Sequence, residues 1–363
     1  PSLSLRRTPE CVWWSMTLLL SHLVLCRLPS SAAASSSARA VALLRVPRRK
    51  HASRSITGPP PLHALATSMA EEVRVISGAW RASLAESPVW SHDEGLLYFI
   101  DSTPLDAPRS ESDATLSICA VNPSGGAVSV MPLPNSPGCI VPSSKGGFLA
   151  ALSANEDGTG GRLMRVTPSN CGGVGGEGTC EIGEQLCDVL NASVLVSMAD
   201  GKNALQCLND GACDAKGRVW VGSKVLEPPS AEAYLPVGEA AGGALKPNRD
   251  APPIGALFCC EQAWSFRDGG MKAIGVPTAV AEVGGVHVSN GIGWSPDGAT
   301  MYYADSPRRC VMAYDFDVST GFLSNARLFA AMAPQCPGGV EGTVGVPDGL
   351  AVDAEGGVWV CLW

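Results

Sequence analysis

The stretch Asn290–Asp305, NGIGWSPDGATMYYAD, predicts the fold of this chain. It contains a short apolar strand, a turn rich in Asp and Gly, and a second strand that closes on aromatic residues. The same plan recurs in Ser87–Asp101 (SPVWSHDEGLLYFID), Val141–Leu152 (VPSSKGGFLAAL), Asn209–Ser223 (NDGACDAKGRVWVGS) and Val346–Trp363 (VPDGLAVDAEGGVWVCLW). A recurring unit of this size cannot bury its own apolar face, so its copies must stack on one another.

Second hairpins are predicted between these units, at Ser117–Leu133, Ala256–Gly275 and Val311–Ala330. Two hairpins make a four-stranded antiparallel sheet, and a ring of such sheets is a β-propeller. We therefore predict an all-β propeller of four-stranded antiparallel blades over residues 71–363. Five units can be counted before the sequence stops at Trp363, which we interpret as a C-terminally truncated ring.

Two intervals between units are longer than the roughly 40–50 residues that a blade needs. They contain stretches rich in Gly, Pro and Ala, near residues 155–183 and 227–253. We predict that both stretches are loop insertions that leave the number of blades unchanged.

Charge is distributed unevenly along the chain. The net charge is −8, and residues 71–363 carry 17 Lys or Arg against 33 Asp or Glu. Phosphate binding needs clusters of Lys and Arg, so this acidic body argues against a nucleic-acid partner. The same balance suits the binding of a cation.

The first 70 residues have the composition of a targeting leader. No acidic residue occurs between Cys11 and Ala70, and Met16–Cys26 is apolar but too short to span a membrane. The segment indicates import into a plastid or mitochondrion, or secretion. Alternatively, Met69 is the true start of a cytoplasmic protein. In either case we expect residues 1–70 to lie outside the fold, and we expect no stable membrane insertion.

The 14 cysteines form no CxxC pair, and their spacing matches no zinc motif. Cys171, Cys180 and Cys187 lie in or near the first predicted insertion. One disulfide among them is compatible with an oxidising compartment, and reduced, partly buried thiols are the alternative.

The available chemistry is that of oxygen ligands. His92 and His287 are the only histidines of the body, and neither GxSxG nor HExxH occurs. Four polar residues, however, lie at the start of a predicted inner strand: Glu86, Asn209, Asn290 and Asp348. Carboxylate and amide oxygens that converge at the axis of a ring suit a hard divalent cation.

Each of these residues also has a purely structural interpretation. Asp348 and Asp210 precede Gly, and Asn209 and Asn290 precede Asp or Gly, so all four could simply hold turns. Repetition at corresponding points of different blades favours a function for all four of Glu86, Asn209, Asn290 and Asp348. We interpret Asp214, Asp297 and Asp353, which lie within hairpin turns, as turn formers.

Five motifs together resemble the SMP-30/gluconolactonase/luciferin-regenerating-enzyme family, which includes regucalcin. They are ESPVW (Glu86–Trp90), NDGACDAKGRVWVGS (Asn209–Ser223), SNGIGWSPDGATMYYADSP (Ser289–Pro307), YDFDVSTGFLSN (Tyr314–Asn325) and PDGLAVDAEGGVWVCLW (Pro347–Trp363). The resemblance implies a six-bladed propeller whose last blade is missing here. It also implies one divalent cation (Ca²⁺, Zn²⁺, Mg²⁺ or Mn²⁺) and the hydrolysis of sugar lactones.

Carried over by motif, the resemblance implies that Glu86, Asn290 and Asp348 are metal ligands, and that Asp348 transfers the proton. Asn209 would contact the substrate, and Glu227 would correspond to a further acidic substrate residue. One departure affects the substrate. Many members carry Arg two residues before the Asn of Asn-Asp-Gly, where this chain has Cys207.

We therefore predict a metal-dependent lactonase that acts on a small-molecule lactone. A calcium-binding regulatory protein with little or no turnover is the alternative, and Cys207 favours it slightly. A propeller that serves only as a protein-binding scaffold would not gather acidic residues at its axis, so Glu86 and Asp348 argue against that third interpretation.

Overall fold

The computed structural model describes 210 of the 363 residues. Side chains are described for residues 82, 84–102, 116–123, 128–156, 158–171, 178–190, 206–226, 232–237, 244–248, 253–260, 280, 283–332 and 345–363. Only the backbone is described for residues 42–46, 264–267, 270–273 and 277–279. Within these ranges the chain is almost entirely β-structure, and its one helical element is the short 3₁₀ helix η3 (Ser306–Arg308).

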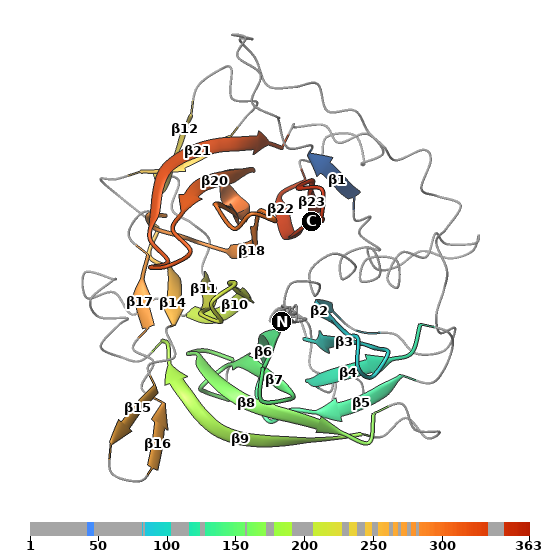
Figure 1. Ribbon diagram of the computed structural model, residues 1–363. Coiled ribbons are helices and arrows are strands. Elements are labelled where there is room, and N and C mark those ends of the chain that lie inside the picture. The colour runs from blue at the N-terminus through green and yellow to red at the C-terminus, as the bar shows by residue number, and fades with distance from the viewer. Residues whose placement is uncertain are drawn as a thin grey trace, which may run out of the picture.

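Five antiparallel sheets lie around a common centre (Figure 1). The first sheet has the order β2 (Ala85–Ser91), β3 (Leu96–Asp101), β4 (Ser117–Val121) and β5 (Ser129–Pro132). The second contains β6 (Pro137–Pro142), β7 (Phe148–Leu152), β8 (Arg162–Ser169) and β9 (Thr179–Asp188). The third contains β10 (Gln206–Cys213), β11 (Val219–Val225), β14 (Leu257–Cys260) and β17 (Pro277–Ala279).

The fourth sheet has the order β18 (Ser289–Trp294), β19 (Thr300–Asp305), β20 (Cys310–Phe316) and β21 (Leu323–Ala331). The fifth contains β22 (Pro347–Val352) and β23 (Val358–Leu362), with β1 (Ala42–Val46) at its edge. The innermost strands are β2, β6, β10, β18 and β22, which surround the centre in Figure 1. The antiparallel blades agree with the predicted architecture.

The core lies between neighbouring sheets because alternate residues of each strand face opposite sides. In β3, Tyr98 and Ile100 pack toward the second sheet, whereas Leu97 and Phe99 belong to a separate cluster on the other face of the first sheet. Three further apolar clusters fill the spaces between the second and third, third and fourth, and fourth and fifth sheets. Stacking of repeated units thus supplies the core that no single unit could form.

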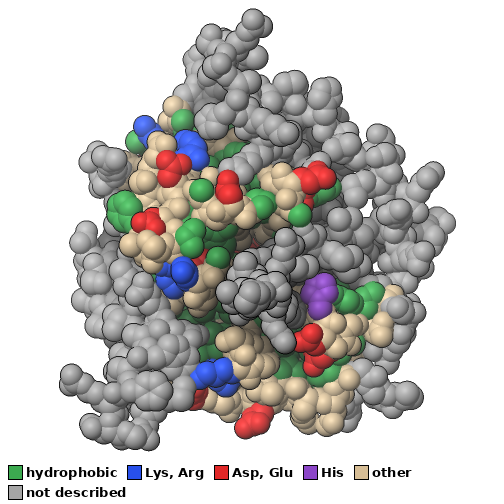
Figure 2. All heavy atoms as spheres, viewed as in Figure 1, with side chains coloured by type: hydrophobic (Ala, Val, Ile, Leu, Met, Phe, Trp, Pro, Cys, Tyr) green, Lys and Arg blue, Asp and Glu red, His purple; other side chains and the backbone are tan. Residues whose placement is uncertain are grey.

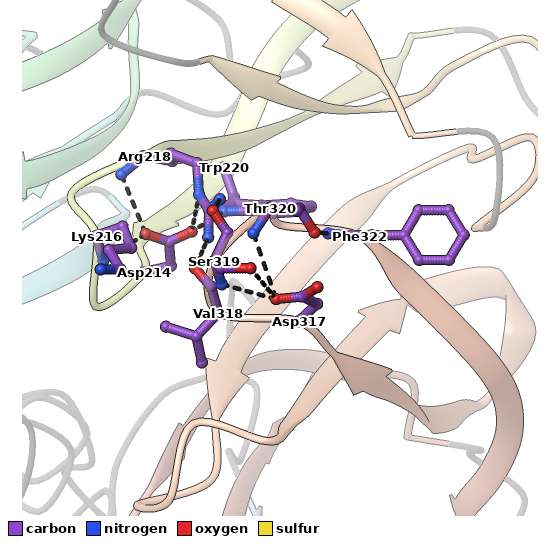
Figure 3. A network of polar contacts seen from close by, with 9 residues as sticks. All are labelled: Asp214, Lys216, Arg218, Trp220, Asp317, Val318, Ser319, Thr320 and Phe322. Atoms are coloured by element: carbon purple, nitrogen blue, oxygen red, sulfur yellow. Dashed lines mark hydrogen bonds and ion pairs between the residues drawn. The ribbon is translucent and has the colours of Figure 1, made fainter.

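Aspartates in the hairpin turns hold the turns, as predicted. Asp214 accepts hydrogen bonds from the backbone N–H groups of Lys216 and Arg218, at 2.8 and 3.1 Å. Its other oxygen accepts from the indole of Trp220 at 3.0 Å and forms a 2.6 Å ion pair with the Arg218 guanidinium. Figure 3 shows that Arg218 also reaches the turn between β20 and β21, donating to the carbonyl of Val318 at 2.8 Å.

Asp353 repeats this arrangement in the fifth sheet. It accepts from the backbone N–H groups of Glu355 and Gly357 and from the indole of Trp359 at 2.9 Å. Asp297 likewise accepts from the Ser295 hydroxyl, in the turn between β18 and β19. In each of these hairpin turns, an aspartate carboxylate accepts hydrogen bonds from residues of the same turn.

Some boundaries differ from the predicted ones. Residues 155–183 were expected to be an insertion, but they contain β8 and the beginning of β9, which complete the second sheet. The second hairpin predicted at Ala256–Gly275 is also wrong, because β14 pairs with β17. The intervening β15 (Trp264–Arg267) and β16 (Gly270–Ala273) form a separate two-stranded ribbon.

The structure describes residues 232–237 and 244–248 of the second predicted insertion. There, β12 (Tyr234–Pro236) and β13 (Leu245–Pro247) form a hairpin outside the four-stranded sheets. The leader differs from expectation at one place, because β1 pairs with β23, from Ala42 opposite Leu362 to Val46 opposite Val358. The rest of residues 1–70 lies outside the described part of the chain.

Cys171, Cys180 and Cys187 are free thiols in the structure.

The described part of the chain contains no helical segment with the length and apolarity needed to span a lipid bilayer. On the face shown in Figure 2, the described acidic and basic side chains are interspersed and form no basic patch.

Candidate functional site

The predicted site residues lie at irregular points of the innermost strands. In β10, β18 and β22 the pairing with the next strand shifts, so that two residues of the inner strand face one residue of its neighbour. The two residues are Asn209 and Asp210 in β10, Asn290 and Gly291 in β18, and Asp348 and Gly349 in β22. Such β-bulges turn side chains out of the regular alternation, and here they occur at the same level of three strands.

Glu86 differs by one position from the other three. In β2 the bulge comprises Ser87 and Pro88, and Glu86 is still paired with Ile100. By register, Ser87 rather than Glu86 corresponds to Asn209, Asn290 and Asp348. Ser87 has a positive φ of 51° and binds the neighbouring β6 by accepting from the Ile140 N–H at 2.8 Å.

The inner strands approach one another closely at this level. A Cβ atom on Gly138 of β6 would lie 2.8 Å from the Asn209 carbonyl, and one on Gly291 of β18 would lie 2.8 Å from the Asp348 carbonyl. Only glycine leaves room for such backbone approach. The bulges of neighbouring sheets are thereby brought together around the centre.

The two asparagines are in direct contact. Asn209 donates through Nδ2 to Oδ1 of Asn290 at 2.9 Å and to the Ser289 carbonyl at 2.8 Å. Asn290 donates in turn to the hydroxyl of Ser306 at 2.7 Å, and Ser306 donates to the Pro347 carbonyl at 2.7 Å. This chain of hydrogen bonds joins the third, fourth and fifth sheets and ends at the residue before Asp348.

Three carboxyl groups interact at the centre of the ring: Glu86, Asp210 and Asp348. Burial, followed by repulsion from Asp348 and Asp210, raises the pKa of Glu86 to about 7. Burial, opposed by the Gly211 N–H and reinforced by Asp348, raises the pKa of Asp210 to about 7. Burial also raises the pKa of Asp348 above its ordinary value, although Lys224 and the Gly349 N–H oppose it.

Few hydrogen bonds to these carboxyl groups occur among the described residues. Glu86 accepts from the Ser102 hydroxyl at 3.2 Å, and Asp210 accepts from the backbone N–H of Gly211 at 2.8 Å. The three groups come from β2, β10 and β22, so three different sheets contribute negative charge to one place.

One basic side chain faces these acids. Lys224 lies in β11 directly opposite Cys207 of β10, and its charge lowers the pKa of both Glu86 and Asp348. On the other side of Lys224, an isolated bridge pairs it with Val288, two residues before Asn290. Cys207, by contrast, is no thiolate, because burial raises its pKa to about 11.

The donor set suits a hard divalent cation. Mutually repelling carboxyl groups with few hydrogen-bond donors gain stability when a cation lies between them, and Asn290 Oδ1 adds a neutral oxygen ligand. No group of three His, Cys, Asp or Glu side chains with metal-binding geometry occurs in the described ranges. A cation site would therefore require the amide oxygen of Asn290 as well as the carboxylates.

The structure thus brings Asn209 and Asn290 into contact and places Glu86 and Asp348 within electrostatic reach of each other. Glu227, the fifth predicted residue, lies outside the described residues. Asp210 and Lys224 are additions to the predicted site. From the sequence, Asp210 is considered only as a residue that could hold a turn, although its place beside Asn209 could have indicated it.

Comparisons with known proteins show which sequences and structures this chain is similar to. A sequence model of the SMP-30/Gluconolactonase/LRE-like region matches residues 84–363. An uncharacterized protein of Sulfolobus acidocaldarius is 25% identical over 283 residues, which cover 78% of this chain and 72% of that protein. Regucalcin of Danio rerio is 26% identical over 280 residues, which cover 77% of this chain and 68% of that protein.

A solved structure of a luciferin-regenerating enzyme aligns with a TM-score of 0.50 at 24% identity, covering 78% of this chain and 70% of that chain. At this identity the likeness supports a shared fold.

Proposed function

The chain belongs to the SMP-30/gluconolactonase/LRE-like family, and from that premise we propose that it hydrolyses sugar lactones with one bound divalent cation. One observation carries this proposal: carboxyl groups from three sheets lie within electrostatic reach of one another, on strands whose bulges also bring Asn209 and Asn290 into contact. Burying like charges together is costly, and a fold that keeps such an arrangement has a use for the charge.

Glu86, Asn290 and Asp348 would hold the cation, with Asp210 adding negative charge nearby. Such an ion polarises the lactone carbonyl toward attack by water. Asn209 would orient the hydroxyl groups of the sugar ring. Its Nδ2 is engaged by Asn290 and Ser289, so its carbonyl oxygen is the group that faces the substrate.

Asp348 would take the proton from the attacking water. A general base works best when its pKa lies near the working pH, and burial raises the pKa of Asp348 in that direction. Its position in the β22 bulge, which corresponds to the bulges of β10 and β18 that contain Asn209 and Asn290, supports this role.

The test is hydrolysis of a panel of aldonolactones followed with a pH indicator. The purified chain would be assayed with EDTA and after adding back Ca²⁺, Zn²⁺, Mg²⁺ or Mn²⁺ in turn. We expect turnover that EDTA abolishes and at least one metal restores. Asp348→Asn should reduce kcat at least 100-fold, as loss of a general base does.

Asp93→Asn is the matched control, because Asp93 is exposed in the turn between β2 and β3. It should retain wild-type turnover. Full activity of Asp348→Asn would remove Asp348 from the mechanism. Tight cation binding without hydrolysis of any lactone would instead support the calcium-binding regulatory alternative.

A further inference from the structure

Lys224 of β11 lies between β10 and the chain that leads into β18, the two strands that carry Asn209 and Asn290. Its neighbour in β10 is Cys207, two residues before Asn209, and its bridge partner is Val288, two residues before Asn290. A hydrogen bond from the Val225 N–H to the His287 carbonyl, at 2.8 Å, fixes this end of β11 against the chain that leads into β18. The backbone therefore holds Lys224 two residues along the strands from each of the two asparagines.

The Lys224 ammonium acts on the acidic groups without pairing closely with any of them. Its charge reaches Glu86, Asp348 and Cys207. Among the described residues, however, no carboxylate lies within 4.0 Å of its nitrogen, and the side chain is only partly buried. A lysine kept for fold stability would be expected to form a close ion pair with such neighbours. Lys224 instead retains the capacity to donate to a ligand.

The charges at the site define what that ligand can be. Glu86, Asp210 and Asp348 contribute three negative charges when ionised, and a divalent cation with Lys224 offsets them. Without Lys224 the loaded site would keep a net negative charge and would repel an anion. With Lys224 it can accept a carboxylate beside the cation.

We propose that Lys224 is a specificity residue that binds the carboxylate of acidic sugars, and that the substrates therefore include lactones bearing a free carboxylate. This inference rests on the proposed lactonase function. The same contact would serve the carboxylate of a sugar-acid product, since opening any lactone creates one.

The experiment compares Lys224→Met, Lys224→Arg and the wild-type chain, all loaded with the same cation. The two substrates are glucono-1,5-lactone, which is neutral, and glucaro-1,4-lactone, which bears a carboxylate. We expect Lys224→Met to lower the ratio of kcat/KM for the acidic over the neutral lactone at least tenfold, mainly through KM. Lys224→Arg should retain most of the ratio. An unchanged ratio in Lys224→Met would overturn the proposal.

Lys216→Met is the matched control. Lys216 is exposed in the turn of the same hairpin, so the variant has the same change in net charge away from the site. It should keep the wild-type ratio. A fall equal to that of Lys224→Met would mean that overall charge, rather than a contact at the site, sets the preference, and would also overturn the proposal.

A second readout does not need turnover. Calorimetry of gluconate binding to the cation-loaded protein should show at least tenfold weaker affinity in Lys224→Met. The cation itself should bind more tightly to this variant, because one positive charge has been removed from its surroundings. If the wild type opens neither lactone, the proposed function fails, and gluconate binding still decides the role of Lys224.

Discussion

Asp210 and Asp214 lie four residues apart on the same inner hairpin, and their carboxyl groups have opposite surroundings. Asp214 is met by two backbone N–H groups, an indole and a guanidinium (Figure 3). Asp210 is met by the single N–H of Gly211 and by the repelling charge of Asp348. At the turn, the charge of Asp214 is paired and hydrogen-bonded within the chain. At the centre, the described residues give Asp210 far fewer such partners, so its charge can interact with a bound ligand.

This difference separates two uses of the same residue type. Buried charges that are fully paired and hydrogen-bonded hold a structure together, whereas buried like charges destabilise it until a ligand arrives. The turn region should therefore lose stability when an aspartate is removed. The central region should gain stability when a charge is removed, at the expense of ligand binding.

The largest effect is expected at the turn. Asp214→Ala leaves the Arg218 guanidinium and the Trp220 indole without their acceptor, and breaking a buried pair in this way costs about 3–5 kcal/mol. Denaturant unfolding measures the loss. Asp297→Ala, at the exposed turn between β18 and β19, is the control and should cost less than about 1 kcal/mol. If Asp214→Ala were as stable as the wild type, the paired charge in the turn would not stabilise the fold, and the proposed difference from the central carboxyl groups would be wrong.

The pH dependence of the metal-free protein should show the opposite behaviour at the centre. Glu86 and Asp210 have pKa values of about 7 in the folded protein, above their ordinary values of 4.5 and 3.8. Their stabilising contribution is therefore complete below about pH 4 and is lost as pH rises toward 7. The loss should amount to roughly 3–4 kcal/mol for each group.

The double variant Glu86→Gln/Asp210→Asn isolates this contribution, because its stability lacks these two titrations. With EDTA present, the stability of the wild type relative to the variant should fall between pH 4 and 8. A saturating divalent cation should reverse the trend by binding the ionised carboxylates. A pH-independent difference would show that the two groups ionise as freely in the folded as in the unfolded chain.

A smaller loss is expected in the fifth sheet. Asp353 repeats the hydrogen bonds of Asp214 to backbone and indole, but Gly357 stands where the first turn has Arg218, and Trp359 is only partly buried. Asp353→Ala should therefore cost about 1–2 kcal/mol, the worth of its hydrogen bonds to backbone and indole. Thermal unfolding would measure the change. A cost equal to that of Asp214→Ala would mean that the guanidinium adds nothing to the turn.

The smallest effect has the opposite sign. Asp210→Asn keeps the size and the hydrogen bond to Gly211 but removes a charge that is ionised at pH 8 at some cost. The new amide has few hydrogen-bond partners, which costs about 1–3 kcal/mol and offsets most of this gain. The metal-free variant should therefore be more stable than the wild type by about 1 kcal/mol. Its affinity for a divalent cation, measured by calorimetry, should be weaker. A destabilised variant would place Asp210 with Asp214 as a structural residue.

Much of the fold could be predicted because each hairpin has a strong local pattern. Phe148–Leu152 and Val358–Leu362 form strands with the predicted bounds, since apolar runs directly follow Gly-containing turns. The strand β17 was missed because it has only three residues and begins with Pro277, so it carries no alternation. The glycine-rich composition of residues 155–183 concealed β8, which pairs with β7, and the beginning of β9, which pairs with β8.

The site was partly predictable for a related reason. Asn209, Asn290 and Asp348 interrupt otherwise apolar strands, and the sequence shows that interruption directly. Lys224 could not be identified, because its place depends on register. A regular hairpin continued from the pairing of Gly211 with Val221 would put Val225 opposite Cys207, and only the bulge at Asn209 and Asp210 moves Lys224 there.

The bulges also affect which substitutions a protein of this architecture can accept during evolution. A residue that stands in a bulge is outside the regular pairing of its sheet, so exchanging it alters the chemistry of the centre while the surrounding pairing is retained. Evolution can thus change the donor set of one strand at a time on an otherwise constant scaffold. New specificities in chains of this architecture should therefore arise more often by substitution at these few positions than by rebuilding of sheets.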